Sequence, residues 1–164
     1  GNQVREALGA QIKQDLSQIG IKVNFTPIDF NNLVNKLSND LDWECHLLGF
    51  TGSIEPHGGL TIWSVDGSLH SFNQSRSNPP LEGREVADWE QEIERLFIEA
   101  SQVFGAEDRK AIYAQAQTIV QEQLPFIYLV NPLSMAAIRN DIQNIKYSAS
   151  GGAFWNIYEL SIDE

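Results

Sequence analysis

The chain has 164 residues, enough for one ordinary domain, and its hydrophobic fraction of 42% can supply a buried core. The formal net charge of −11 argues against a general nucleic-acid surface, which needs a basic face, and against attraction to anionic lipid. The single cysteine, Cys45, excludes an intrachain disulfide.

The first residues, Gly1-Asn2-Gln3, lead almost at once into a helical pattern. Such an abrupt start suggests a segment cut from a longer protein, so the missing signal peptide says little about cellular location. No apolar run in the sequence approaches the roughly 20 residues of a membrane-spanning helix.

The first part of the chain alternates between helical and strand patterns. Apolar periodicity predicts a helix over 4–19, a strand over 21–26, a helix over 30–37 and a strand over 43–50. Gly20 is a suitable stop for the first helix, and Asp29 is placed to cap the second. The rhythm of helix and strand predicts the α/β class, with a mixed sheet that carries helices on both faces.

The second part contains two long helical patterns and several short strand candidates. "ADWEQEIERLFIEASQVF" has a regular apolar face, and "EDRKAIYAQAQTIVQEQL" begins with the acidic residues that favour a helix start. We expect short strands in "FIYLVNP" and "SMAAIRN", around an Asn131-Pro132 turn. The tail offers two more strand candidates, separated by Gly151-Gly152.

An irregular, glycine-rich segment follows the strand predicted over 43–50. Residues 53–86 show no convincing period, and connections of this length are usually functional or disordered. The part from Gly49 to Phe72 is rich in aromatic side chains, and ligands of α/β folds bind beyond the carboxyl ends of strands. We therefore expect a ligand-facing wall here. The alternative is that Trp63 and Phe72 only pin the loop to the core.

Catalytic and metal chemistry are weaker interpretations of the same loop. Ser53, His57 and Asp66 could form a hydrolase triad, but their spacing matches no recognised geometry and the serine lacks a strand-to-helix elbow. His57, His70, Glu55 and Asp66 carry ligand atoms for a metal, without a ligand spacing. We expect no catalytic residue, no metal and no cofactor, and keep the hydrolase as an alternative.

A third hypothesis is a protein-interaction module. The helix predicted over 88–104 would then present an aromatic and aliphatic face, which includes Trp89, Leu96 and Phe97, to a partner. Burial of these three side chains within the monomer would exclude this alternative.

Several motifs follow one another along the chain. They are a helix ending in "IGIKV", the following "PIDFNNL", and "DWECHLLGF" leading into a loop with "EP". A helix followed by a proline and a hydrophobic segment, "EDRKAIYAQAQTIVQEQLPFIYLVNP", comes later. In their order and spacing these motifs resemble the C-terminal lobe of family 5 extracytoplasmic solute-binding proteins, the peptide, oligopeptide and nickel type binding components of ABC importers. The resemblance covers nearly the whole chain.

The resemblance implies one lobe of a two-lobed, periplasmic-binding-protein-like fold. Residues 1–138 would form most of the C-terminal lobe, without its first strand, and residues 139–164 would cross back toward an absent N-terminal lobe. Two lobes would close over a peptide or other small solute, and the closed form would dock on permease subunits in the membrane. The resemblance thus implies a non-enzymatic, extracytoplasmic receptor, periplasmic or lipid-anchored.

Loop composition and resemblance together predict a set of ligand-binding residues: Phe50, Thr51, Gly52, Ser53, Glu55, His57, Trp63 and Asp66. Peptide-binding members of the family place an aspartate after "GW", and it pairs with the ligand's α-ammonium. Phe50 corresponds to that tryptophan, and Ser53 or a neighbour to that aspartate. A serine offers a neutral hydrogen bond instead of a charge-assisted pair, which puts the peptide ligand in question.

The tail carries apolar residues that the absent lobe would cover. They are Phe154, Trp155, Ile157 and Tyr158. We therefore expect the isolated chain to self-associate or to swap its tail.

Overall fold

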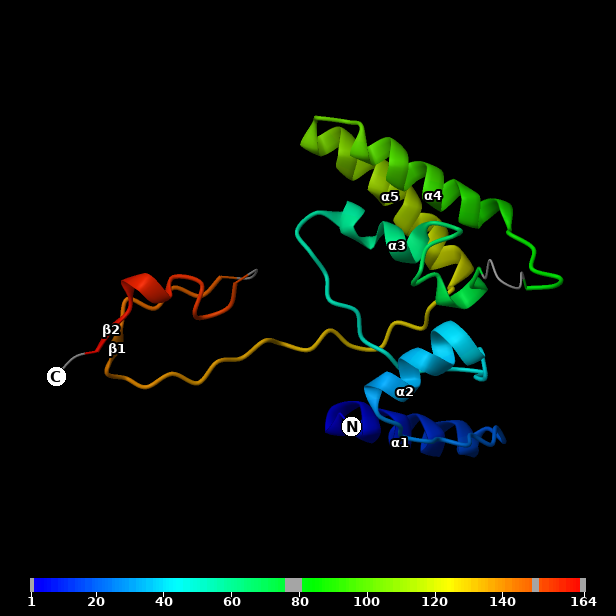
Figure 1. The fold of residues 1–164 in the computed structure, drawn as a ribbon, viewed down its shortest axis with the longest axis horizontal. Helices are drawn as coiled ribbons and strands as arrows, with labels where there is room; N and C mark the ends of the chain where they lie inside the picture. Colours follow the sequence, from blue (N-terminus) through cyan, green and yellow to red (C-terminus); the bar gives the residue numbers. More distant parts are fainter. Residues whose placement is uncertain (1, 76–80, 149–150, 163–164) are drawn as a thin grey trace.

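The computed structural model describes residues 2–75, 81–148 and 151–162. Figure 1 shows a helical body, further helices beside it, and a C-terminal unit at the far end of an extended segment. The helices are α1 (Gln3–Gln18), α2 (Phe30–Asn35), α3 (Leu60–Trp63), α4 (Asp88–Ser101) and α5 (Ala106–Gln123). The strands are β1 (Ile142–Gln143) and β2 (Ser161–Ile162). Among the described residues, no helix has the length and apolar character needed to cross a bilayer.

Gly20 and Asp29, which were predicted to end one helix and to cap the next, both do so. Gly20 has a φ of +84°, and its N–H donates to Ser17 O while Ile21 N–H donates to Leu16 O, which closes the end of α1. Asp29 Oδ1 accepts from Asn32 N–H at 3.0 Å and caps α2. The helical backbone then continues as a π-helical turn over Lys36–Asp40.

The core lies between α4 and α5. Apolar residues at helical spacing on each helix meet there, and this face of α4 is fully buried at Ile93, Leu96 and Ala100. The buried cluster consists of Ile93, Leu96, Phe97, Ala100, Ile112, Tyr113, Ala116 and Val120. Leu96 and Phe97 are buried in this cluster and Trp89 packs partly buried against it, so the aromatic face proposed for a protein-interaction module lies largely inside the monomer and that alternative is not favoured.

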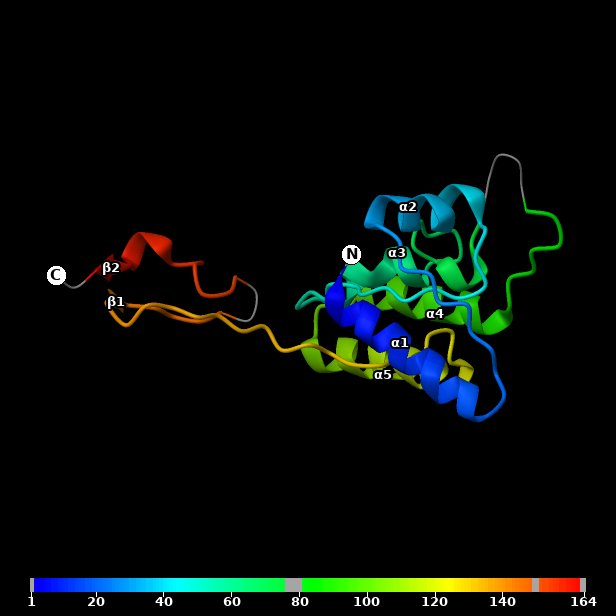
Figure 2. The same ribbon diagram turned by 90° about the horizontal axis from the view of Figure 1, so that it is seen from below.

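The predicted strands before the tail are the main error of the sequence interpretation. Residues 21–26, 43–50, 126–132 and 134–140 form no strand in the described structure, and the sheet it contains is the antiparallel pair β1–β2. The described residues do combine helix and strand, but their sheet has two short strands and lies away from the α-helices (Figures 1 and 2). Alternating apolar residues indicate a half-buried extended segment, whereas a strand also needs a partner for its backbone groups.

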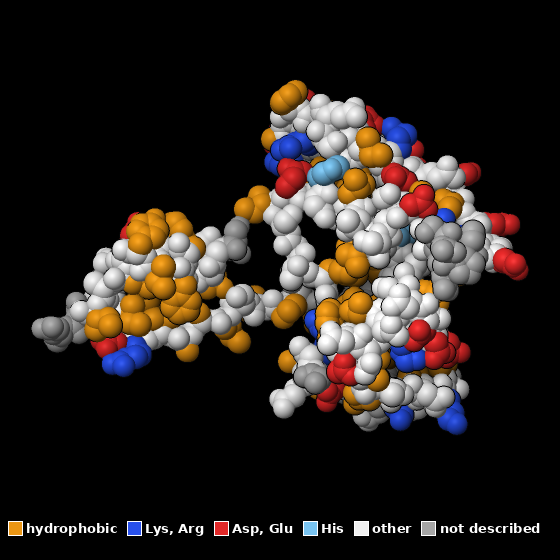
Figure 3. All heavy atoms as spheres, viewed as in Figure 1, with side chains coloured by type: hydrophobic (Ala, Val, Ile, Leu, Met, Phe, Trp, Pro, Cys, Tyr) orange, Lys and Arg blue, Asp and Glu red, His pale blue; other side chains and the backbone are white. Residues whose placement is uncertain are grey.

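The C-terminal unit lies away from the helices in both ribbon views (Figures 1 and 2). Ile142 pairs with Ile162 in its two-stranded sheet, and Asn156 is completely buried within the unit. Figure 3 shows hydrophobic side chains gathered on its surface. The four tail residues that were expected to lack cover are all exposed: Phe154, Trp155, Ile157 and Tyr158.

We predict that Leu96→Ala lowers the free energy of unfolding by about 2–5 kcal/mol, because it leaves a cavity between α4 and α5. Ile98→Ala is the matched control, since Ile98 lies on the same helix with 42% of its surface exposed. That variant should lose less than about 1 kcal/mol. Urea denaturation measures both, and equal losses would contradict the assigned core.

Candidate functional site

The segment from Gly49 to Phe72 contains more regular structure than its sequence indicated. A 3-10 turn at Pro56–Gly59 leads directly into α3, and a second 3-10 turn covers Ser71–Asn73. Gly67 closes the intervening bend, where a Cβ atom would collide with the carbonyl oxygen of Thr61. The prediction of an entirely irregular segment is therefore wrong, and these turns fix the direction of the side chains.

Trp63 joins the segment to the helical core. Its ring centroid lies 6.2 Å from that of Phe97 on α4, 6.2 Å from Phe72 and 5.8 Å from Phe126. Phe72 in turn stacks on Trp89 at 5.8 Å. Trp63 and Phe72 therefore both anchor the segment to the helical body, as the alternative interpretation of these two aromatics expected.

The first residues of the segment form an exposed edge. Phe50, Thr51, Gly52 and Ser53 are all exposed, and Phe50 keeps 43% of its surface in solvent. The ring of Phe50 meets Phe126 edge to face at 6.1 Å. The exposed groups of this edge are therefore one aromatic ring, two hydroxyl-bearing side chains and the backbone of residues 50–53.

Glu55 ties this edge to α5. Its Oε2 lies 3.1 Å from Arg109 Nη1, and the Tyr113 hydroxyl donates to its Oε1 at 3.4 Å. Burial raises the pKa of Tyr113, and the negative charge of Glu55 raises it further. Ser53 Oγ donates to the Glu55 backbone oxygen at 2.5 Å. The positive charge of Arg109 therefore partly compensates the negative charge of the Glu55 carboxylate.

Two other predicted ligand-binding residues, His57 and Asp66, lie in different environments. His57 is half-buried, and its Nδ1 has no hydrogen-bond partner among the described residues. Asp66 has a largely exposed side chain that meets Arg84 Nη1 at 3.5 Å. Ser53, His57 and Asp66 are not linked by hydrogen bonds in the described structure, so the geometry does not favour the hydrolase. The described residues also hold no cluster of metal-ligating side chains.

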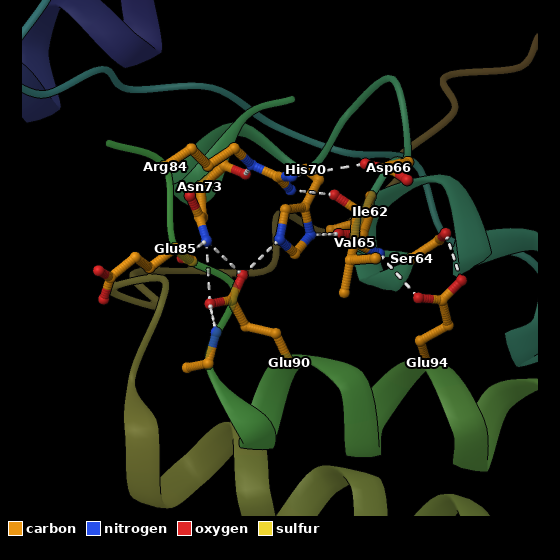
Figure 4. Close-up of polar contacts among 11 residues, drawn as sticks. Ile62, Ser64, Val65, Asp66, His70, Asn73, Arg84, Glu85, Glu90 and Glu94 are labelled. Carbon is orange, nitrogen blue, oxygen red and sulfur yellow. Dashed lines mark hydrogen bonds and ion pairs between the residues drawn. The ribbon is translucent and has the colours of Figure 1, made fainter. Parts of the chain in front are cut away.

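A buried polar cluster holds the second half of the segment on α4 (Figure 4). His70 is 1% exposed, and its Nδ1 and Nε2 each lie 2.8 Å from an acceptor, Ile62 O and Glu90 Oε2 respectively. Asn73 Nδ2 donates to Glu90 Oε2 at 2.9 Å, and Ala87 N–H donates to Glu90 Oε1 at 3.0 Å. Glu90 thus connects the loop to the first turn of α4.

Glu94 and Arg84 make a second set of attachments (Figure 4). Glu94 accepts from Ser64 Oγ at 2.8 Å and from Val65 N–H at 3.2 Å. Arg84 Nε donates to Asn73 O at 3.1 Å, and its Nη2 donates to Val65 O. Sequence reasoning missed both glutamates, although acidic residues four positions apart on one helix share a face and were a readable signal.

Burial alone would raise the pKa of Glu90. Hydrogen bonds from Ala87 N–H, His70 and Asn73 outweigh this effect and hold the pKa of the carboxyl below its ordinary value. The folded protein therefore binds this proton less readily than the unfolded chain does. It follows that Glu90 stabilises the fold above its ordinary pKa of 4.5 and that this stabilisation is lost as the pH falls below it.

We predict that Glu90→Gln lowers the free energy of unfolding at pH 7 by about 1–3 kcal/mol, because buried donors lose their charged acceptor. The variant should also show a smaller loss of stability than the unmodified chain below pH 4.5. Urea denaturation at several pH values measures both effects. Glu122→Gln, an exposed change on α5, is the control, and an unchanged acid dependence in Glu90→Gln would contradict the assignment.

Comparison with curated proteins gives three relatives. The chain is 26% identical to probable di/tripeptide-binding protein 5 of Pseudomonas aeruginosa over 148 residues, which cover 88% of this chain and 26% of that protein. It is 28% identical to a probable ABC transporter-binding protein of Deinococcus radiodurans, with 78% of this chain and 22% of that protein covered. It is 29% identical to di/tripeptide-binding protein 4 of Pseudomonas aeruginosa, with coverage of 84% and 24%.

The chain therefore spans about a quarter of the length of the curated relatives that it matches. No family model matches it, and no solved structure gives a significant match. The chain is similar over most of its own length to two proteins named as di/tripeptide-binding and one named as ABC transporter-binding, which agrees with its resemblance to the binding components of ABC importers.

Proposed function

We propose that the chain is part of an extracytoplasmic solute-binding protein that captures a small peptide-like solute between two lobes and delivers it to an ABC permease. The observation that carries this proposal is the similarity to three such binding proteins over 78–88% of the chain. A hydrolase finds less support, because Ser53 Oγ donates to a backbone carbonyl and Asp66 pairs with Arg84.

The proposed solute surface is the exposed edge at Phe50–Ser53. The ring of Phe126 contacts both Phe50 and Trp63 and so links this edge to the helical core. Phe50 supplies apolar contact, while Thr51, Gly52 and Ser53 supply hydroxyl and backbone groups. Two of the relatives are named as di/tripeptide-binding proteins, which supports a peptide-like solute. The neutral Ser53 and the pairing of Glu55 with Arg109 leave this edge without an uncommitted carboxylate for an α-ammonium group. The solute would therefore be held by aromatic contact and neutral hydrogen bonds.

The proposed division of the chain assigns residues 1–138 to one lobe and residues 139–164 to a crossing toward the other. The separation of the C-terminal unit from the helices supports this division (Figures 1 and 2). The curated relatives are about four times as long as the matched region, which leaves ample sequence for a second lobe.

We predict that a longer protein containing this chain binds dipeptides and tripeptides with saturable quenching of tryptophan fluorescence. Phe50→Ala should weaken binding by about tenfold, since it removes an exposed aromatic contact from the solute surface. Phe50 is a better test than Trp63, whose replacement would disturb the core. Val4→Ala, an exposed change on α1, should leave affinity unchanged. Equal affinity in all three proteins would contradict the placement of the site.

Ser53→Asp tests how the solute is recognised. A carboxylate at this position should favour peptides with a free α-ammonium over their N-acetylated forms by about tenfold, relative to the unmodified protein. Calorimetric titration of one dipeptide and its N-acetylated form measures this ratio in both proteins. An unchanged ratio would show that residue 53 does not face the solute's amino terminus.

Self-association of the isolated 164-residue chain is a further part of this proposal. Light scattering should give a mass at least twice that of one chain, because the exposed apolar residues of the C-terminal unit gain cover in a complex. Ile157→Asp should restore the mass of one chain, whereas Phe104→Asp, at a fully exposed position beside α4, should not. A monomeric unmodified chain would contradict this prediction.

A further inference from the structure

Among the described residues, His70 is the most deeply buried titratable side chain, with 1% of its surface exposed. Its imidazole ring lies between α3 and the first turn of α4 (Figure 4). Nδ1 lies 2.8 Å from the backbone oxygen of Ile62, and Nε2 lies 2.8 Å from Oε2 of Glu90. Each ring nitrogen therefore faces an oxygen atom at hydrogen-bond distance.

Both of these oxygen atoms need a donor. A backbone carbonyl oxygen can only accept, and so can an ionised carboxylate. Although burial opposes it, hydrogen bonds from Ala87 N–H, His70 and Asn73 hold the pKa of Glu90 below its ordinary value, so this carboxyl group is ionised at neutral pH. A neutral imidazole carries a hydrogen on one nitrogen and would turn the lone pair of the other toward an oxygen. The imidazolium ion has a hydrogen on each nitrogen and satisfies both oxygen atoms.

The immediate surroundings of His70 are suited to a positive charge. A buried cation requires an opposite charge beside it, and Glu90, itself 4% exposed, supplies one. The ring of Phe72 lies 4.1 Å from the imidazole, centroid to centroid, and an aromatic ring at this distance attracts a cation. The histidine and the glutamate together form a pair without net charge, which removes much of the cost of burying either group.

The other charged side chains around this pair are already engaged. Glu94, one turn further along α4, accepts two hydrogen bonds from the loop. Arg84 donates to two backbone oxygen atoms of the loop and meets Asp66 at 3.5 Å. The side chain of Glu85 points away from the imidazole in Figure 4, and α3 and the 3-10 turn after the histidine carry no charged residue. Among the described residues, the imidazole ring therefore has one counter-ion, the carboxylate on the first turn of α4.

We propose that His70 is doubly protonated in the folded protein at neutral pH, and that its bound proton fastens the loop to α4. The imidazolium donates from Nδ1 to Ile62 O and from Nε2 to Glu90, so it joins α3 to α4. Loss of the proton removes one of these hydrogen bonds and leaves a lone pair facing an oxygen atom. This attachment concerns the second half of the loop, so it goes beyond the proposed solute site and does not depend on it.

The bound proton makes the attachment sensitive to pH in a defined direction. An unfolded histidine releases its proton near neutral pH, whereas the folded protein retains the proton of His70. The folded state then binds more protons than the unfolded state, and stability falls as the pH rises above neutrality. Glu90 alone has the opposite effect, since its contribution is lost in acid. The pair therefore holds the loop most firmly between these two limits.

The direct test is the protonation of the histidine rings of the 164-residue chain at pH 7, read from long-range proton–nitrogen NMR spectra with the signals assigned through the backbone. We expect hydrogen on both ring nitrogens of His70. His46 is the internal control and should show one bare nitrogen, because burial lowers its pKa and its Nδ1 has no hydrogen-bond partner among the described residues. A bare nitrogen in His70 would overturn the proposal.

Urea denaturation between pH 7 and pH 9 tests the effect on stability. The unfolding equilibrium constant of the unmodified chain should rise by up to about tenfold per pH unit, because the folded protein holds one proton more. His70→Gln should lack this rise, whereas His46→Gln should keep it, since His46 is uncharged in this range. Equal pH dependence in all three proteins would overturn the proposal and leave the proposed function open to its own test. If His70→Gln does not fold, the ring-nitrogen measurement on the unmodified chain decides.

Discussion

The packing of α4 against α5 is the interaction on which the rest of the described structure depends. Ile93, Leu96 and Ala100 are almost inaccessible to solvent in this contact, and no comparable cluster forms elsewhere among the described residues. Hydrophobic burial of this kind supplies most of the free energy that orders a small domain. The loop from Gly49 to Phe72 has little core of its own and takes its position from this helix pair.

Glutamates and aromatic rings on α4 hold that loop in different ways. Glu90 and Glu94 bind its second half through directional hydrogen bonds, whereas Phe97 contacts Trp63 through ring packing. The edge at Phe50–Ser53 lies before these attachments and remains exposed.

Local features of the fold were predictable from sequence, and non-local ones were not. Apolar spacing identified α4 and α5, while Gly20 and Asp29 marked helix ends through contacts a few residues away. The prediction of strands at 21–26 and 43–50 was wrong, because alternation of apolar and polar residues does not show whether a second strand is available for backbone hydrogen bonds. Glu90 was missed because its partners lie 17 and 20 residues earlier in the chain. The sequence singled out the aromatic residues of the loop. Which of them anchor the loop, as Trp63 and Phe72 do, and which stay exposed, as Phe50 does, depends on the tertiary fold.

The central claim is that this chain belongs to a receptor for a small peptide-like solute. Native mass spectrometry of the longer protein, before and after incubation with a mixture of dipeptides and tripeptides, tests it most directly. The account predicts a noncovalent complex of one protein with one solute in the mass range of short peptides. A protein that keeps its bare mass both as purified and after incubation would contradict the account.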